Sequence, residues 1–313
     1  MGVCKKKPNE SEGEVSPMYE QGNLDRAIDQ KICRDLIAQC TIEHDLPFKW
    51  VEYRSMQLLF KYLNPYFQSI TRNTAASDVM RIYERLKERL RLILKNISGM
   101  LCLTCGVWTA CTNAGYICLT VHYVDEKWRL NNNILSFYDM PPPHSGFELS
   151  KKVYDCLVDW GIDRKVFSIT LDNAYASDVM DYVDYRHRSQ GESSSGDTKS
   201  NLDKYLEDDQ LNELDDIDVL TYWKEKEHRY GELAKMACDV LSIPITSVAS
   251  ESAFSIGAHI LNKYRNRLLP KKVQALICTL RPFAGDELRN AQRRSKTMPR
   301  FRWPPRQLIV VVV

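Results

Sequence analysis

Residues 100–137 read MLCLTCGVWTACTNAGYICLTVHYVDEKWRLNNNILSF, and this stretch decides the fold class. It holds three β-rich segments, at 100–104, 116–123 and 128–137, and Gly115 marks the turn before the second. Strand-like segments joined by short, turn-rich connections favour antiparallel pairing. The stretch therefore predicts a three-stranded antiparallel meander.

The residues that follow extend the meander into an α+β domain. Residues 147–161 (FELSKKVYDCLVDWG) have the apolar spacing of a helix that ends at a glycine. Residues 166–171 (VFSITL) are a continuous apolar run, typical of a buried strand, and Asp172 follows them. Three antiparallel strands, a helix and a fourth strand form the beginning of a ribonuclease H-like fold, although many other α+β folds begin in the same order.

Helical periodicity flanks this domain on both sides. A long helix is predicted from about Ser77 to Gly99, and a final helix begins at Pro270. The sequence thus divides into a disordered arm (1–23), a helical region (24–99), a truncated ribonuclease H-like domain (100–187), a linker (188–200), a helical carboxy-terminal region (201–283) and a basic and apolar tail (284–313), which we expect to be disordered.

Composition restricts the class of protein. Hydrophobic residues make up 44% of the chain and charged residues 27%, which is ordinary for a globular protein and excludes a fibrous or wholly disordered one. No apolar run reaches the roughly 20 residues of a membrane-spanning helix, and the first residues lack the apolar core of a secretory signal. We therefore expect an intracellular protein with no membrane partner, whose ten cysteines are mostly free thiols.

Charge is distributed unevenly along the chain. Residues 81–95 carry six basic and two acidic groups, residues 201–230 carry ten acidic and four basic groups, and residues 289–306 carry seven basic groups and no acid. Such blocks are typical of solvated faces and tails, and a basic block is also typical of a surface that binds a polyanion or of a nuclear localisation signal. The sequence leaves these alternatives open.

Several longer stretches carry a family resemblance. They are DLPF at 45–48, residues 103–128, PPPHSG at 141–146, residues 160–178 (WGIDRKVFSITLDNAYASD), and, in the second half, LDKYLED, YWKEKEHRYGELAKMACDVLSIPITSVASESAFS and YRNRLLPKKVQALICTL. Over residues 25–283 the chain resembles plant hAT-superfamily transposase-derived proteins of the DAYSLEEPER and RICESLEEPER type. The resemblance implies a partial ribonuclease H-like domain followed by the hAT carboxy-terminal dimerisation region.

The resemblance also implies a catalytic trio of two aspartates and a glutamate. Such carboxylates hold two divalent metal ions against the phosphate to be cleaved. Asp172 matches the second position and Glu251 the third, but Gly106 stands where the first aspartate is expected. We therefore expect no nuclease or transposase activity, no bound metal and no cofactor. Asp125 and Asp178 are near in sequence, but neither is expected at the strand end that the site requires.

Two further features of the family are expected to be missing. Full-length members begin with a BED-type zinc finger, whereas residues 1–100 offer only Cys4, Cys33, Cys40 and His44, without paired metal-ligand spacing. The family also continues the catalytic sheet after the second aspartate and then carries a large helical insertion. Here the dimerisation region begins already at residue 201, soon after Asp172, so the chain resembles an internally deleted copy.

Four cysteines in the meander raise the alternative of a zinc site. Cys102 and Cys105 form a C-x-x-C pair, and Cys111 and Cys118 follow. A structural zinc site usually places its pairs on turns, whereas this pair lies in a predicted strand. Buried core thiols are the favoured interpretation.

The resemblance and the charge pattern give two sets of candidate binding residues. Large apolar residues of the carboxy-terminal region are expected to serve dimerisation: Trp223, Leu233, Met236, Leu241, Phe254, Leu268, Leu269 and Leu276. Basic residues outside the acidic block are candidates for weak contact with nucleic acid: Arg85, Arg89, Lys263, Arg265 and Arg267. The expected partners are a second copy of the chain, other hAT-derived proteins and, weakly, DNA.

Three functions remain open on these grounds. The favoured one is a catalytically inactive, transposase-derived nuclear protein that acts through dimerisation. The second is a module that binds nucleic acid without sequence preference. The third is a residual nuclease or transposase, which Gly106 argues against.

Overall fold

The computed structural model describes residues 28–111, 113–140, 146–172, 201–208, 218–246, 248–261, 265, 268–283 and 308–312. The arm predicted at residues 1–23, the linker at 188–200 and the helix expected after Asp172 lie outside this part of the chain. Within it, no helix is long and apolar enough to cross a membrane.

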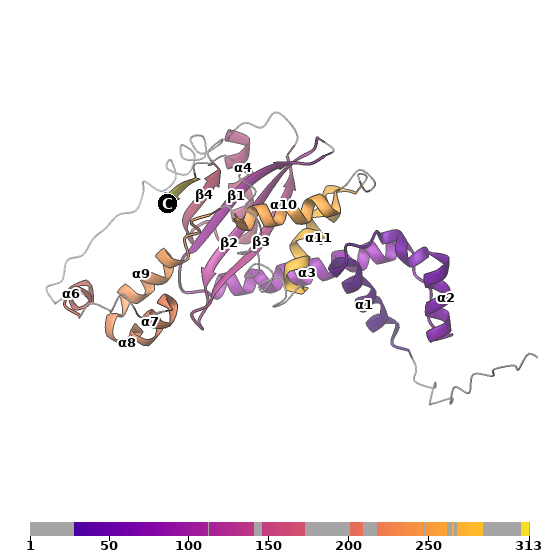
Figure 1. Cartoon of the computed structure of the whole chain (residues 1–313), viewed down its shortest axis with the longest axis horizontal. Helices are drawn as coiled ribbons and strands as arrows, with labels where there is room; N and C mark the ends of the chain where they lie inside the picture. Colours follow the sequence, from indigo (N-terminus) through magenta and orange to yellow (C-terminus); the bar gives the residue numbers. More distant parts are fainter. Residues whose placement is uncertain are drawn as a thin grey trace, which may run out of the picture.

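The centre of the molecule is a mixed five-stranded sheet (Figure 1). Its strands are β1 (Leu101–Thr109), β2 (Gly115–Val124), β3 (Leu130–Asp139), β4 (Val166–Asp172) and β5 (Leu308–Val312), and their order in the sheet is β3-β2-β1-β4-β5. The predicted antiparallel meander of β1, β2 and β3 is confirmed. β4 lies parallel to β1, as the intervening helix requires.

The last strand corrects the expectation for the tail. Residues 308–312 are not disordered but pair antiparallel with β4, from Ser168 opposite Val312 to Asp172 opposite Leu308. β-Branched residues favour extended backbone, and an unpaired edge at β4 offers them a row of hydrogen-bonding groups. The basic part of the tail lies outside the described residues.

Both faces of β1 and β2 are largely buried, which explains why these strands have nearly continuous apolar sequences. Alternate residues of β1, Leu101, Leu103 and Cys105, belong to a core that also contains residues of α4 (Gly146–Trp160). The residues between them face the carboxy-terminal helices on the other side of the sheet. Gly161 ends α4 with a left-handed φ of +68°, as its position after the helix predicts.

The region before the sheet is helical, as predicted. It contains α1 (Gln30–Glu43), the 3₁₀ helix η1 (Phe48–Glu52), α2 (Arg54–Leu63) and α3 (Arg72–Asn96). α3 begins earlier than the predicted Ser77, because the Thr71 side chain accepts a hydrogen bond from the backbone N–H of Thr74 and caps the helix.

An ion-pair cluster ties α1 to α3. Asp78 of α3 is buried, and its two carboxylate oxygens accept hydrogen bonds from Nη2 and Nε of Arg34 at 2.7 and 2.8 Å. Arg81 adds a third hydrogen bond at 3.1 Å and also pairs with Asp35. The carboxylate is therefore fully used in holding two helices together.

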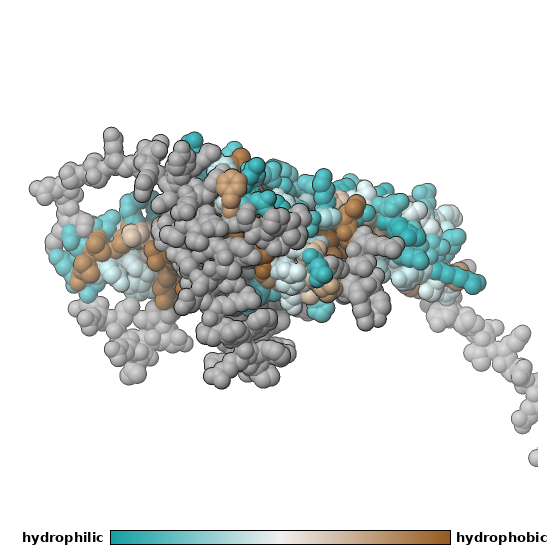
Figure 2. Space-filling view, turned by 90° about the horizontal axis from the view of Figure 1, so that it is seen from above, coloured by the Kyte–Doolittle hydropathy of each residue, from teal (hydrophilic) through white to brown (hydrophobic). Residues whose placement is uncertain are grey.

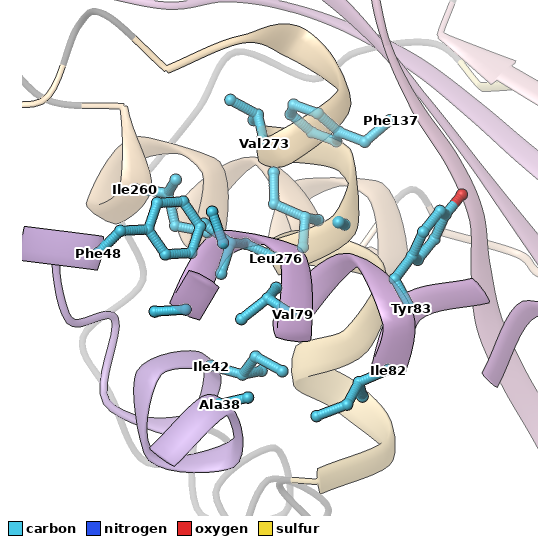
Figure 3. Close-up of a cluster of buried hydrophobic side chains, with 14 of the residues drawn as sticks. Ala38, Ile42, Phe48, Val79, Ile82, Tyr83, Phe137, Ile260, Val273 and Leu276 are labelled. Carbon is cyan, nitrogen blue, oxygen red and sulfur yellow. The ribbon is translucent and has the colours of Figure 1, made fainter. Parts of the chain in front are cut away.

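The carboxy-terminal helices are α6 (Asn201–Leu206), α7 (Val219–Glu225), α8 (Glu227–Tyr230), α9 (Glu232–Leu241), α10 (Val248–Ile260) and α11 (Pro270–Phe283). α10 crosses β1 and β2, and α11 lies against β3, α3 and α1 (Figure 1). Val79 and Ile82 of α3 share a core with Ile260 of α10 and Leu276 of α11, and Phe137 joins it from β3 (Figure 3). Helices α10 and α11 therefore complete the same core as the sheet and the first helices.

Candidate catalytic site

The strand register brings the first two trio positions side by side. Thr104 is opposite Thr170, and Cys105 is opposite Leu171, in the parallel β1–β4 pair. Continuing this register by one residue places Gly106 beside Asp172, the last residue of β4. The two positions are therefore neighbours where β4 ends, three residues before the end of β1.

Helix α10 covers Gly106 directly. A Cβ atom added at Gly106 would lie 3.0 Å from Cζ and 3.1 Å from Cε2 of Phe254, and 3.2 Å from Cβ of Ser250. These distances are shorter than ordinary van der Waals contact, which begins at about 3.4 Å. A side chain at position 106 would therefore require the Phe254 ring or α10 to move by a few tenths of an ångström.

The third trio position lies on the same helix. Glu251 is in the first turn of α10 and is solvent-exposed, while its neighbours Ser250 and Ala253 are buried against the sheet. The helix thus brings Glu251 to the end of the sheet that holds Gly106 and Asp172, with its side chain on the outer side of α10. The three positions implied by the resemblance therefore lie at one end of the sheet.

A packed aromatic group holds Phe254 in place over β1. Its ring stacks on Trp108 with centroids 6.0 Å apart and an angle of 17° between the planes, and it meets Phe137 edge-on at 6.3 Å. Trp108 also contacts Tyr116 and packs against Gly257 one turn further along α10. Phe254, predicted as a dimerisation residue, is therefore half-buried in the contact between α10 and the sheet.

Small polar side chains lie under the carboxy-terminal helices on this face of the sheet. Thr104 Oγ1 is 3.1 Å from Nε2 of His122, Thr170 Oγ1 donates to the carbonyl of Pro244 at 3.0 Å, and Cys102 Sγ is 3.0 Å from Oγ of Ser242. Our sequence analysis did not identify this layer. The signal was the alternation of Thr and Ser with apolar residues in β1 and β4.

Asp125, one of the two nearby aspartates, lies far from Gly106. Gly106 is opposite Cys118 in the β1–β2 pair, and Asp125 comes seven residues after Cys118, which places it about 23 Å away along β2. Burial alone would raise the pKa of Asp125, but hydrogen bonds from Arg129 and its positive charge lower it, so the carboxylate is ionised and committed to the hairpin turn. Asp178 lies outside the described residues.

The cysteines of the meander do not converge on one point. Cys102 faces α9 and Cys105 faces the α4 side, so the strand directs the C-x-x-C pair to opposite faces of the sheet. Cys118 is buried in the other core, and Cys111 is exposed and donates to the Leu261 carbonyl. Within the described residues, no group of His, Cys, Asp or Glu has the arrangement of a metal site.

The remaining candidates for dimerisation differ in exposure. Leu276 is buried in the shared core, and Trp223, Leu233, Leu241 and Leu268 are half-buried. Met236 and Leu269 are exposed, with 59% and 63% of their surface accessible. These two side chains can therefore contact a partner without a change in the core.

Trp223 belongs to an aromatic cluster at the outer end of the carboxy-terminal region. It stacks on Tyr205 of α6 at a centroid distance of 5.3 Å and meets Tyr230 of α8 edge-on at 5.7 Å. The hydroxyl group of Tyr230 donates to Asp208. These contacts join α6, α7 and α8 into one unit.

The basic candidates also differ. Arg85 and Arg89 are exposed and lie four residues apart on α3. Two other basic residues of this helix, Lys87 and Arg91, form ion pairs with Asp159. Within the described residues, neither Arg85 nor Arg89 has an ion-pair partner. The basic block at 81–95 is therefore partly neutralised, and these two residues present charge to solvent.

Arg265 has a different role. Its guanidinium donates to the carbonyls of Asp45 and Leu46 at 2.9 and 3.2 Å and lies over the ring of Phe48. Burial lowers the pKa of Arg265, as expected for a cation withdrawn from water. It fixes the DLPF segment rather than facing solvent. Lys263 and Arg267 lie outside the described residues.

Comparison with known protein families gives two matches that follow the architecture. Residues 104–192 match the ZBED1 RNase-like domain, and residues 201–281 match the hAT family C-terminal dimerisation region. The first match covers β1–β4 and the second covers α6–α11.

Curated relatives agree with these matches. The chain is 36% identical to "Putative AC transposase" of Zea mays over 44% of its own length and 17% of the relative. It is 29% identical to "Zinc finger BED domain-containing protein RICESLEEPER 2" of Oryza sativa subsp. japonica over 56% of its length and 26% of the relative. It is 27% identical to "Zinc finger BED domain-containing protein DAYSLEEPER" of Arabidopsis thaliana over 50% of its length and 23% of the relative.

The chain spans about a quarter or less of the length of these relatives. Among the described residues of the two matched regions, helices α10 and α11 share a buried core with the sheet. The chain therefore carries an RNase-like domain of the ZBED1 kind followed by the C-terminal dimerisation region of the hAT family, and it is related to plant proteins of the AC transposase, RICESLEEPER and DAYSLEEPER type.

Proposed function

We propose that this chain is a transposase-derived nuclear protein that does not cleave DNA and acts by associating with a second copy of itself or with related hAT-derived proteins. The observation that carries the proposal is the contact between Gly106 and Phe254. A metal-dependent site needs a carboxylate on β1 beside the end of β4, and here a glycine packs closely against the Phe254 ring.

The loss of one carboxylate is sufficient to disable such a site. Two metal ions held a few ångström apart need ligands on several sides, and a glycine supplies none. Asp172 and Glu251 supply carboxylates at only two of the three catalytic positions. Asp125 lies beyond the end of β2 that is far from Gly106, so it cannot supply the third. Loss of electrostatic stabilisation by one such group costs about 3–4 kcal/mol of barrier, which corresponds to a rate lower by about 10²–10³.

Plasmid nicking tests the absence of catalysis. Supercoiled plasmid incubated with the chain and Mg²⁺ or Mn²⁺ is expected to stay uncut. The Asp172→Ala variant, prepared in the same way, serves as the control for contaminating nuclease. Nicking by the chain that disappears in the Asp172→Ala variant would show a living active site and refute the proposal.

Self-association is supported by an apolar surface on the dimerisation region. Figure 2 shows hydrophobic side chains gathered at the end of the molecule where α6 to α9 lie in Figure 1. The exposed large hydrophobic residues among the described part of the matched region are Leu202, Tyr205, Leu206, Val219, Met236, Val240, Ile245, Val248 and Leu269. A group of exposed apolar side chains of this kind marks an interaction surface.

Helix α9 offers the sharpest probe of this surface. Met236 and Val240 are one turn apart on α9 and are 59% and 45% exposed, so aspartate at both positions removes apolar area without disturbing a core. Leu58→Asp on α2 is a matched control, because Leu58 is also 59% exposed but lies outside the dimerisation region.

Sedimentation of the full chain measures the outcome. We expect a mass of at least a dimer for the chain and for Leu58→Asp, and a shift toward the monomer mass for the Met236→Asp and Val240→Asp double variant. A concentration-independent monomer mass for the unmodified chain would refute the proposal of self-association.

A second candidate function, weak nucleic-acid binding, is favoured by the exposed charges of Arg85 and Arg89 on α3. Binding through phosphate contacts releases counterions, so affinity is expected to fall steeply with salt and to be indifferent to sequence. Replacing both arginines with glutamine should reduce the salt slope by about 2, whereas Lys127→Gln on the β2–β3 turn should leave it unchanged. An affinity that does not change with salt would contradict this function.

Nuclear residence is the third part of the proposal. It is supported by the relationship to BED-type and transposase-type proteins and by the basic residues between 289 and 306. A fluorescent fusion of the chain is expected to accumulate in nuclei. Uniform cytoplasmic distribution would contradict it.

A further inference from the structure

The sheet is closed at one edge by a strand that comes from far away in the sequence. β4 pairs on one side with β1, and in the part of the chain that the structure describes its other side is paired only with β5. The pairing runs from Ser168–Val312 to Asp172–Leu308. Without residues 308–312, the backbone groups of β4 on this side would form an open sheet edge.

The chemistry of this strand suits pairing with any copy of β4. Its sequence, LIVVV, has no charge, no proline and four β-branched residues, so it lacks the features with which proteins usually protect edge strands. The bonds of a β-ladder are made by backbone groups. The strand of a second copy would make the same bonds in the same register.

The covalent connection does not restrict the strand to its own chain. Residues 284–307 separate α11 from β5. A segment of that length spans at most about 80 Å when fully extended, which exceeds the size of a domain. Either copy in a dimer is therefore within reach.

We propose that the β4 edge is a strand-acceptor site and that two copies of this chain exchange residues 308–312 across it. Exchange of an identical element keeps every strand contact and changes only which chain supplies it. The free-energy difference between the closed and the exchanged forms then depends on the effective concentration of the second strand.

This inference rests on the self-association proposed above, because only a dimer holds the second strand at a high effective concentration. The dimerisation region, residues 201–281, lies between β4 and β5 in the sequence. Two copies joined through it hold both strands near both β4 edges, at effective concentrations on the order of millimolar. Closed and exchanged forms then compete on nearly equal terms.

Disulfide trapping between two distinguishable chains tests the exchange. One full chain carries Thr170→Cys and an affinity tag, and the other carries Val310→Cys; the two positions are paired in the β4–β5 register. Paired residues of antiparallel strands have Cα atoms about 4.5–5.5 Å apart, within the range of a disulfide. We expect a tagged-to-untagged disulfide after the chains are mixed under reduction and then oxidised.

A second cysteine pair makes the test independent of one variant. Ile169→Cys with Val311→Cys examines the neighbouring register position, where Ile169 lies in the core on the α4 side of the sheet. Wild-type chain mixed with Val310→Cys measures pairing with the native cysteines. Lys127→Cys mixed with Val310→Cys measures disulfide formation by random collision, since Lys127 is exposed on the turn between β2 and β3 and is not paired with β5.

The outcomes separate this inference from the proposed function. Cross-chain disulfide at least tenfold above the Lys127→Cys control supports exchange. A dimer mass together with only intrachain disulfide in the Thr170→Cys and Val310→Cys double variant overturns the exchange and leaves self-association intact. A monomer mass together with no cross-chain product overturns both.

Discussion

The substitution Gly106→Ala tests the packing that closes the candidate site. Its Cβ atom would lie 3.0 Å from Cζ of Phe254 and 3.2 Å from Cβ of Ser250, closer in both cases than ordinary van der Waals contact. The Phe254 ring cannot move freely, because it is stacked on Trp108 and meets Phe137 edge-on. Overpacking of this kind costs about 1–3 kcal/mol. Replacing glycine also reduces the entropy of the unfolded chain, which returns about 0.4–1 kcal/mol.

We therefore expect Gly106→Ala to lower the free energy of unfolding by about 1–2 kcal/mol. The measurement is equilibrium unfolding in urea, followed by tryptophan fluorescence and circular dichroism. For a chain of this size the same loss corresponds to a melting temperature lower by about 2–8 °C.

A double-mutant cycle with Phe254→Leu identifies the cause. Leucine lacks the Cζ and Cε2 atoms that approach position 106, so the alanine should cost less in this background, with a coupling energy of about 0.5–2 kcal/mol. Equal costs in both backgrounds, or a Gly106→Ala variant as stable as the unmodified chain, would refute this account of the closed site.

The same contact predicts that an aspartate does not restore catalysis. Gly106→Asp adds a charged group to a buried position already filled by Phe254, which costs at least about 1–3 kcal/mol beyond the alanine. We expect no nicking with Mg²⁺ or Mn²⁺ from Gly106→Asp alone. Metal-dependent nicking by this variant would show that the site needs only the carboxylate.

Three further substitutions test other parts of the structure. Asp78→Ala should lower the free energy of unfolding, measured in urea, by roughly 2–3 kcal/mol. This is less than the usual cost of breaking a buried ion pair, because the Arg34 side chain is 38% exposed and keeps part of its contact with water. Burial raises the pKa of Asp45, against the charge of Arg265, so the stability that this carboxyl group contributes should fall as pH rises from about 3.9 through the raised value; the difference between thermal scans of the unmodified chain and of Asp45→Asn from pH 3 to 7 isolates this contribution, and a difference that is constant with pH contradicts it. Gly161→Ala meets no atom within 4 Å but must adopt a φ of +68°, so it should lower the free energy of unfolding by about 1 kcal/mol, and Asn at the same position by less.

The sheet could be predicted from sequence because its signals are local. Gly115 and the β-rich runs on each side of it indicate a hairpin, and the spacing of residues 147–161 indicates the helix that makes β4 parallel to β1. The positions of Gly106 and Asp172 followed from the family pattern. In the structure they are neighbours where β4 ends, because the β1–β4 register, continued by one residue beyond Cys105 and Leu171, pairs them.

Contacts between distant segments could not be predicted in this way. Leu308–Val312 read as an isolated apolar run in a basic tail, since nothing in its own sequence indicates that β4 has an open edge. From sequence alone Arg265 is interpreted as a free cation, because its partners, the carbonyls of Asp45 and Leu46, belong to a segment near the start of the chain. Phe254 read as an interface residue for the same reason, before its contact with Gly106 was visible.

The dimerisation region is structurally part of the ribonuclease H-like domain. Ile260, Val273 and Leu276 are buried in a core that also contains Val79 of α3 and Phe137 of β3, so residues 201–283 without the rest of the chain would expose the apolar side that they bury here (Figure 3). The helix that covers Gly106, α10, belongs to this same region. The close packing of α10 on β1 depends on the absence of a side chain at position 106, because a Cβ atom there would lie 3.0 Å from the Phe254 ring. A surface for a second copy can then persist on the outer side of α9, where Met236 faces solvent, while the inner side of α10 closes the site.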